Sequence, residues 1–376
     1  MRGKLIAYRI GKAIGLFSLA RVLTRRKLRI LAYHGVELRD ESRFIPSMFI
    51  RAETFAARLE LLRRKYPVLP LAEAVRRVKD GTLPPCAVAI TIDDGFHSTG
   101  AIAVRLLRSA GLPAMLYVTT YYTQRDVPVF RLAMQYCFWK TDSGSLDIAS
   151  LGTGVQGTAP LGTNAEKFEI AWELINYGER DLDEEGRTAL LNTTAAALGV
   201  DLGPLLRDRF LHLMTPEELR LADSVVDVQL HTHRHRLPDQ LLQVRAEIED
   251  NRAALAPLVH RPLVHFCYPS GFWSEAFFPA LAAAGIETAT TCEGGFNGAD
   301  VHPYALKRFI DGEHITPLEF EAELSGLPEL LRVVARWLGR ARRRIHIDEA
   351  DRRRGYSAGH GRTILERGVP GVSAIR

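Results

Sequence analysis

The sequence predicts an α/β protein in which strands and helices alternate along one chain. Three observations support this class. Short continuous apolar runs, such as residues 86–92, are typical of strands buried on both faces, as in parallel sheets. Segments with apolar residues at helical spacing follow several of these runs. Chemically reactive side chains come directly after the runs, where barrel-like α/β folds place their active sites.

The expected elements follow in chain order. Strands are expected over residues 28–33, 86–92, 114–118, 225–230, 263–268, 288–292 and 305–310. Helices are expected over 49–65, 71–79, 100–110, 241–258, 275–284 and 317–325, and a capping box with proline starts another at Thr215. Residues 122–214 interrupt the alternation with a hairpin over 146–163 and helices over 165–177 and 184–198. We interpret them as a helical insertion in one domain over 28–330.

The composition is that of an ordinary globular protein. The chain has 376 residues, of which 47% are hydrophobic and 25% charged. It has no run of about 18 uncharged apolar residues, so a membrane-spanning helix is not expected. The 4 cysteines are scattered without the spacing of a metal or disulfide motif. This usage favours reduced thiols and a cytoplasmic location.

Both ends of the chain are strongly basic. Residues 1–30 carry nine Lys or Arg and no acid, and residues 331–376 form an Arg-rich tail with twelve Arg and four acids. We expect residues 1–27 to be a basic amphipathic segment, helical over 5–23, that contacts an anionic inner-membrane surface peripherally. The alternative is a helix packed on the body with solvated charges. Basic tails also bind nucleic acids, but no nucleic-acid motif is present, so no such partner is expected.

Two short motifs carry the chemistry. Asp93-Asp94-Gly95 follows the expected strand at 86–92, and His231-Thr232-His233-Arg234-His235 follows the one at 225–230. A catalytic zinc site has three protein ligands and one open position. Asp94, His231 and His235 offer one oxygen and two nitrogens, while Asp93 points the other way along an extended chain and suits a general base. Either motif alone is common in solvated turns, and His233 is expected to be such a loop residue.

Together the motifs resemble those of the polysaccharide deacetylase family, the NodB-homology group or carbohydrate esterase family 4. Residues 91–95, Thr-Ile-Asp-Asp-Gly, are similar to its first motif, T-F-D-D-G, and residues 231–235 to its second, H-[S/T]-x-x-H. The resemblance covers roughly residues 28–325, with 122–214 matched much less, and includes the Tyr33-His34 run. It implies a distorted (β/α)7 barrel with a helical insertion, a divalent metal, usually zinc, and hydrolysis of acetyl groups on sugars.

Carried over by position, the resemblance makes Asp93 the base and Asp94, His231 and His235 the metal ligands. It also implies that Thr232 hydrogen-bonds within its loop to hold the two histidines.

The third family motif aligns with the turn Tyr268-Pro269-Ser270, and the N–H of Ser270 would then stabilise the oxyanion. This sequence departs from the family pattern at two points. Cys267 stands where an arginine often orients the base. The late Leu-x-His motif that supplies the general acid is not evident: His314 lies in the right region with different neighbours, and His34 is a second candidate, with a core position as its alternative.

Three further side chains are expected to bind substrate. Tyr268 and Trp273 are placed to stack on a sugar ring, and Arg308 to reach the site from the last strand; core packing and a surface position are the alternatives. The expected substrates are N-acetylated sugars of a polysaccharide or glycolipid precursor. The alternative functions are a deformylase or other amide hydrolase on the same scaffold, and a sugar-binding relative with weak or lost turnover.

Overall fold

A computed structural model describes residues 2–335, and its main sheet contains seven parallel strands in the order β10-β9-β8-β5-β4-β1-β11. The sheet curls, so the chain before β11 reaches β10 through a bridge between Thr290 and Leu306. This is the distorted (β/α)7 barrel that the sequence predicts. The strands, each shorter than or equal to its expected run, are β1 (Arg29–Tyr33), β4 (Val88–Ile92), β5 (Met115–Val118), β8 (Asp227–Leu230), β9 (His265–Cys267), β10 (Thr288–Thr290) and β11 (Phe309–Ile310).

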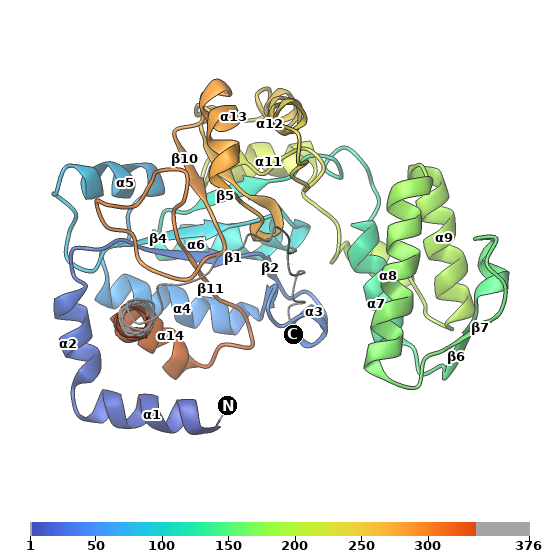
Figure 1. Ribbon diagram of the computed structural model, residues 1–376, viewed down its shortest axis with the longest axis horizontal. Helices are drawn as coiled ribbons and strands as arrows, with labels where there is room; N and C mark the ends of the chain where they lie inside the picture. The colour runs from blue at the N-terminus through green and yellow to red at the C-terminus, as the bar shows by residue number, and fades with distance from the viewer. Residues whose placement is uncertain (1, 336–376) are drawn as a thin grey trace, which may run out of the picture. The chain divides into compact units, whose positions relative to one another are not determined.

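Helices cover the sheet because each presents an apolar stripe to it (Figure 1). Phe55, Leu59 and Leu62, for example, lie on one face of α4 and are buried in the main core. The expected helix over 100–110 begins with a π-helical turn, η1. The covering elements are α4 (Ala52–Lys65), α5 (Leu71–Lys79), η1 (Thr99–Ala103), α6 (Val104–Ala110), α11 (Pro216–Asp223), α12 (Leu241–Leu255), η3 (Pro269–Gly271), η4 (Glu275–Phe277), α13 (Phe278–Ala283) and α14 (Pro317–Ser325).

The region expected as an insertion forms a helical group, drawn mostly in green in Figure 1. The group has its own apolar core. The sequence predicts its hairpin and its two long helices but not α7 and α10. Phe49 and Phe96 of the barrel side join this core, with ring centroids 5.1 Å apart. The elements are α7 (Phe130–Lys140), β6 (Ser145–Asp147), η2 (Ile148–Leu151), β7 (Thr158–Pro160), α8 (Asn164–Asp181), α9 (Glu184–Ala197) and α10 (Gly203–Asp208). Near the barrel, β2 (Gly35–Val36) pairs with β3 (Phe49–Ile50). The short helix α3 (Glu41–Phe44) belongs to the chain segment that connects these two strands.

The N-terminal segment contains two helices, so the single helix expected over 5–23 is wrong. Gly15, at φ 83°, separates α1 (Arg2–Ala13) from α2 (Leu16–Leu23). Both belong to the compact unit of residues 1–327, where Tyr8 and Phe17 pack with Ala322 of α14. None of the described helices is long and apolar enough to cross a bilayer. Most of the Arg-rich tail lies outside the described residues.

Candidate active site

The chemistry-bearing motifs meet at one end of the sheet. Asp93 and Asp94 follow β4, and His231 and His235 follow β8. The carboxyl ends of parallel strands share one edge, so residues far apart in the chain come together there. They line a cavity of about 630 Å³.

Asp94, His231 and His235 form a triangle of ligand atoms. The Oδ1 atom of Asp94 is 3.2 Å from Nε2 of His231 and 3.2 Å from Nε2 of His235. This oxygen is buried without a hydrogen bond among the described residues. Ligands about 2.0–2.1 Å from a tetrahedral zinc ion lie roughly 3.3 Å apart. The three residues therefore fit a divalent ion with one carboxylate and two imidazole ligands.

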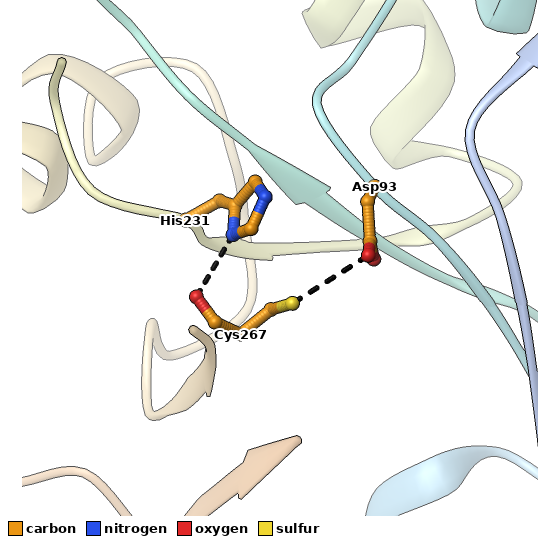
Figure 2. Close-up of side chains that lie close together, drawn as sticks. All are labelled: Asp93, His231 and Cys267. Atoms are coloured by element: carbon orange, nitrogen blue, oxygen red, sulfur yellow. Dashed lines mark hydrogen bonds between the residues drawn. The ribbon is translucent and has the colours of Figure 1, made fainter. Parts of the chain in front are cut away.

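A hydrogen bond at Nδ1 of His231 orients the ring so that Nε2 faces Asp94. Its Nδ1 lies 2.8 Å from the carbonyl oxygen of Cys267, as Figure 2 shows. A carbonyl only accepts, so Nδ1 carries the proton and the lone pair of the neutral ring is on Nε2. The backbone N–H of His231 also donates to Oδ1 of Asn251, at 2.9 Å. His231 is therefore held in the orientation that a metal ligand requires.

A buried arginine, Arg308, holds Asp93. Arg308 directly precedes β11, which ends the strand order on one side of the sheet. Arg308 donates from Nη1 to Oδ1 of Asp93 at 2.7 Å and from Nη2 to Oδ2 at 2.8 Å. It also donates to Thr91 and to the carbonyl of Thr291, and none of its surface is exposed. The substrate-binding role expected for Arg308 does not match this position, because the side chain lies behind the base.

The contact between Arg308 and Asp93 also bears on Cys267, which stands where the family often has an arginine that orients the base. An arginine does orient the carboxylate, but it reaches Asp93 from residue 308 rather than 267. The thiol of Cys267 lies 3.6 Å from Oδ2 of Asp93.

Both aspartates are held in the ionised form. Burial raises the pKa of Asp93, but the Arg308 guanidinium outweighs burial and leaves this pKa below its ordinary value. Burial also raises the pKa of Asp94, and the His235 and His231 imidazoles outweigh it, so this pKa lies well below its usual range. At Asp93 the opposite charge of Arg308, at hydrogen-bond distance, thus overcomes the loss of solvation.

A second trio, Asp93, His231 and Cys267, also has potential ligand atoms within 4.8 Å of one another (Figure 2). Its atoms are already engaged. Both oxygens of Asp93 accept from Arg308, and Nδ1 of His231 donates to the Cys267 carbonyl. The first trio is therefore the better candidate for a metal site.

Two further expected catalytic residues line the cavity. The Nε2 atom of His34 is 3.9 Å from Oδ2 of Asp93, and its Nδ1 is buried without a hydrogen bond among the described residues. Ser270 lies across the cavity in the left-handed region, at φ 56°. Its backbone N–H makes no hydrogen bond within the described part of the chain, so this donor is open to a ligand.

Of the other expected contacts, Tyr268 lines the cavity, whereas Trp273 and His314 do not. The Tyr268 ring has no exposed surface and its hydroxyl donates to the carbonyl of Tyr304 at 3.0 Å, so it has no free face for a sugar. Trp273 donates to Glu293 at 3.1 Å and does not line the cavity. His314 is outside the cavity as well, with Nδ1 3.0 Å from the carbonyl of Pro46. Of the two histidines considered as the general acid, only His34 faces the site.

The histidine loop is not held as the resemblance implies. Oγ1 of Thr232 is buried and makes no hydrogen bond among the described residues. Asn251 holds the loop instead, since it accepts from His231 and donates to the carbonyl of Val118 at 3.0 Å. His233 is a half-buried loop residue with Nδ1 2.9 Å from Oγ1 of Thr120, and it lies outside the ligand trio.

The far wall of the cavity comes from the insertion, which sequence reasoning did not connect with the site. Phe168 and Trp172 are one turn apart on α8, with ring centroids 6.0 Å apart, and Phe168 is 61% exposed. The Arg131 guanidinium lies 5.3 Å from the centroid of Trp172. The sequence signal available for this wall was an aromatic pair at i, i+4 on an expected helix. The insertion residues lining the cavity include Tyr122, Val129, Arg131, Leu132, Gln135, Phe168, Trp172, Glu179 and Arg187.

Comparisons with known proteins agree with this geometry. The polysaccharide deacetylase family model matches residues 208–289, which include the histidine motif and Ser270, so the resemblance is confirmed. The deacetylase PplD from Streptococcus pyogenes, solved in complex with acetate, is 15% identical, with 80% of this chain and 99% of that chain covered and a TM-score of 0.52. It shows the same fold.

Two other solved structures are similar at lower TM-scores. IcaB from Ammonifex degensii is 16% identical, with 80% of this chain and 97% of that chain covered and a TM-score of 0.49. The BpsB deacetylase domain from Bordetella bronchiseptica is 16% identical, with 76% and 96% covered and a TM-score of 0.46. No curated protein matches the sequence.

Proposed function

We propose that the chain is a metal-dependent hydrolase that removes acetyl groups from N-acetylated sugars of a polysaccharide or glycolipid precursor. The observation that carries the proposal is the ligand triangle of Asp94, His231 and His235 beside the ionised Asp93. This donor set suits zinc. A divalent ion held there would polarise the acetyl carbonyl and lower the pKa of water.

The chain's own residues supply the proton transfers. Asp93 takes a proton from the attacking water while the water oxygen bonds to the acetyl carbon. The N–H of Ser270 donates to the oxyanion that forms on the carbonyl oxygen. His34 gives a proton to the sugar nitrogen as the carbon–nitrogen bond breaks, and acetate and a free amine leave. Arg308 acts as a positioning residue, because it touches only the base and the scaffold.

The test is acetate release from an N-acetylglucosamine oligomer, measured together with the zinc content of the purified chain. Replacing the base, Asp93→Asn, is expected to lower release by about 1,000-fold with zinc retained, whereas Asp94→Asn is expected to lose both. The matched control is Asp80→Asn, the same change at an exposed carboxylate, which is expected to change neither.

Two results would contradict the proposal. Release by Asp93→Asn at the wild-type rate would remove the assigned base. Faster release of formate from an N-formylated oligomer than of acetate from the acetylated one would favour the deformylase instead.

A further inference from the structure

The two N-terminal helices carry an aliphatic surface that the body of the protein does not cover. Seven large aliphatic side chains of α1, α2 and the turn between them are between 38% and 67% exposed. We call this surface the N-terminal aliphatic face. Soluble monomers rarely expose a contiguous apolar patch of this kind unless it binds something. Its members are Ile6, Ile10, Ile14, Leu16, Leu19, Val22 and Leu23.

This face is distinct from the one that packs on the protein. In α2, Phe17 and Ala20 point inward and are 3% and 1% exposed, whereas Leu16, Leu19 and Leu23 recur at i, i+3 and i+7 on another side. A helix that is apolar on both sides needs a second apolar environment. In α1, Tyr8 packs inward, and the exposed isoleucines recur every four residues.

The charged residues of the N-terminal segment itself are all basic. Residues 1–30 contain no acid. Lys4 and Lys12 are used to anchor α1 on α14, through Glu319 at 3.1 Å and Glu321 at 2.7 Å. Arg9, Arg25 and Arg26 are exposed and form no ion pair with any described residue. Free cations therefore border the exposed aliphatic side chains.

We propose that the N-terminal aliphatic face binds peripherally to an anionic lipid surface. The aliphatic side chains enter the boundary between headgroups and acyl chains, and the arginines contact the anionic headgroups. Helices of 12 and 8 residues lie on a bilayer rather than cross it. A second copy of the chain is a poor occupant, because a two-fold contact would bring two acid-free basic segments against each other. This inference does not depend on the proposed deacetylase activity.

Flotation of the full chain with vesicles tests the proposal. We expect binding to vesicles of phosphatidylcholine with phosphatidylglycerol, weaker binding to phosphatidylcholine alone, and release at high salt. The double change Ile10→Glu, Leu19→Glu is expected to lower the bound fraction about tenfold. The matched control is Leu221→Glu, Leu242→Glu, which places the same residues at positions on α11 and α12 that are 67% and 83% exposed; it is expected to float like wild type.

Three outcomes would overturn the proposal. The first is failure of the full chain to float with anionic vesicles. The second is flotation of the Ile10→Glu, Leu19→Glu chain as well as wild type, as binding through the Arg-rich tail alone would predict. The third is a wild-type dimer that this double change converts to a monomer without any effect on flotation. Acetate release from a water-soluble oligomer, measured on every variant, separates loss of membrane binding from misfolding and from failure of the proposed function.

Discussion

The two walls of the cavity are built in different ways. On the barrel wall, Asp93, Asp94 and His231 are 1%, 5% and 2% exposed, and Asp93 and His231 are hydrogen-bonded to residues far away in the chain. On the insertion wall, Phe168 is 61% exposed and packs beside Trp172 on a single helix. The side chains that need a fixed geometry therefore lie on the sheet, whereas the exposed aromatic surface of the cavity lies on an added unit with its own core.

The barrel wall is most sensitive at Arg308. The change Arg308→Met leaves Asp93 buried without its partner, so we expect turnover to fall by about 100-fold or more and stability by about 3–5 kcal/mol. Arg308→Lys keeps the charge but not the two parallel hydrogen bonds and is expected to be intermediate. The measurements are turnover and denaturant unfolding.

The control for Arg308 is another buried arginine away from the site. Arg29 is 1% exposed and donates to the carbonyls of Leu324 and Lys27. We expect Arg29→Met to destabilise the fold while folded molecules keep their turnover. Equal turnover losses in the two variants would show that Arg308 acts only through stability.

The separation of the two cores is tested by one matched pair of changes. Phe138 lies in the insertion core and Phe266 in the barrel core, and they are 2% and 0% exposed. Each change to alanine is expected to cost about 3–5 kcal/mol. Segment-resolved hydrogen exchange should show faster exchange in α7–α9 alone for Phe138→Ala, with zinc retained, and faster exchange across the sheet with weaker zinc binding for Phe266→Ala. Loss of protection in both regions by either change would mean that the cores act as one.

The smallest expected effect is on the insertion wall. Phe168→Ala removes an aromatic surface that faces the cavity without touching the base or the ligands. We expect a several-fold rise in KM for a longer oligosaccharide, roughly 1 kcal/mol of contact, with kcat unchanged. Leu206→Ala is the control, because Leu206 is 49% exposed on the insertion but does not line the cavity. A fall in kcat at constant KM would move Phe168 into the catalytic machinery.

Much of the barrel could be predicted because its signals are local. Continuous apolar runs mark the strands, and the two motifs sit directly after them. Helix α7 was missed because seven of its 11 residues are buried, which leaves only a narrow polar face at Arg131 and Gln135 to indicate a helical period. The break at Gly15 was missed because a glycine inside an apolar pattern is tolerated in many helices.

The arginine that holds Asp93 could not be assigned from local pattern either. Its contact spans 215 positions in the chain, and only the closure of the sheet brings β11 beside β1 and the neighbouring β4. The burial of Tyr268 could not be predicted for a similar reason. The sequence shows an aromatic residue at a strand end, but not that its hydroxyl donates a hydrogen bond to the carbonyl of Tyr304.

Asp94, Thr232, His235 and Ser270 all have φ between 51° and 69°. For a residue with a side chain this backbone conformation costs on the order of 1 kcal/mol or more, and glycine adopts it freely. A chain selected only for stability would therefore carry glycine at these four positions. The strained residues mark where this sequence gives up stability to keep its side chains, and a laboratory selection for heat resistance would be expected to remove activity there first.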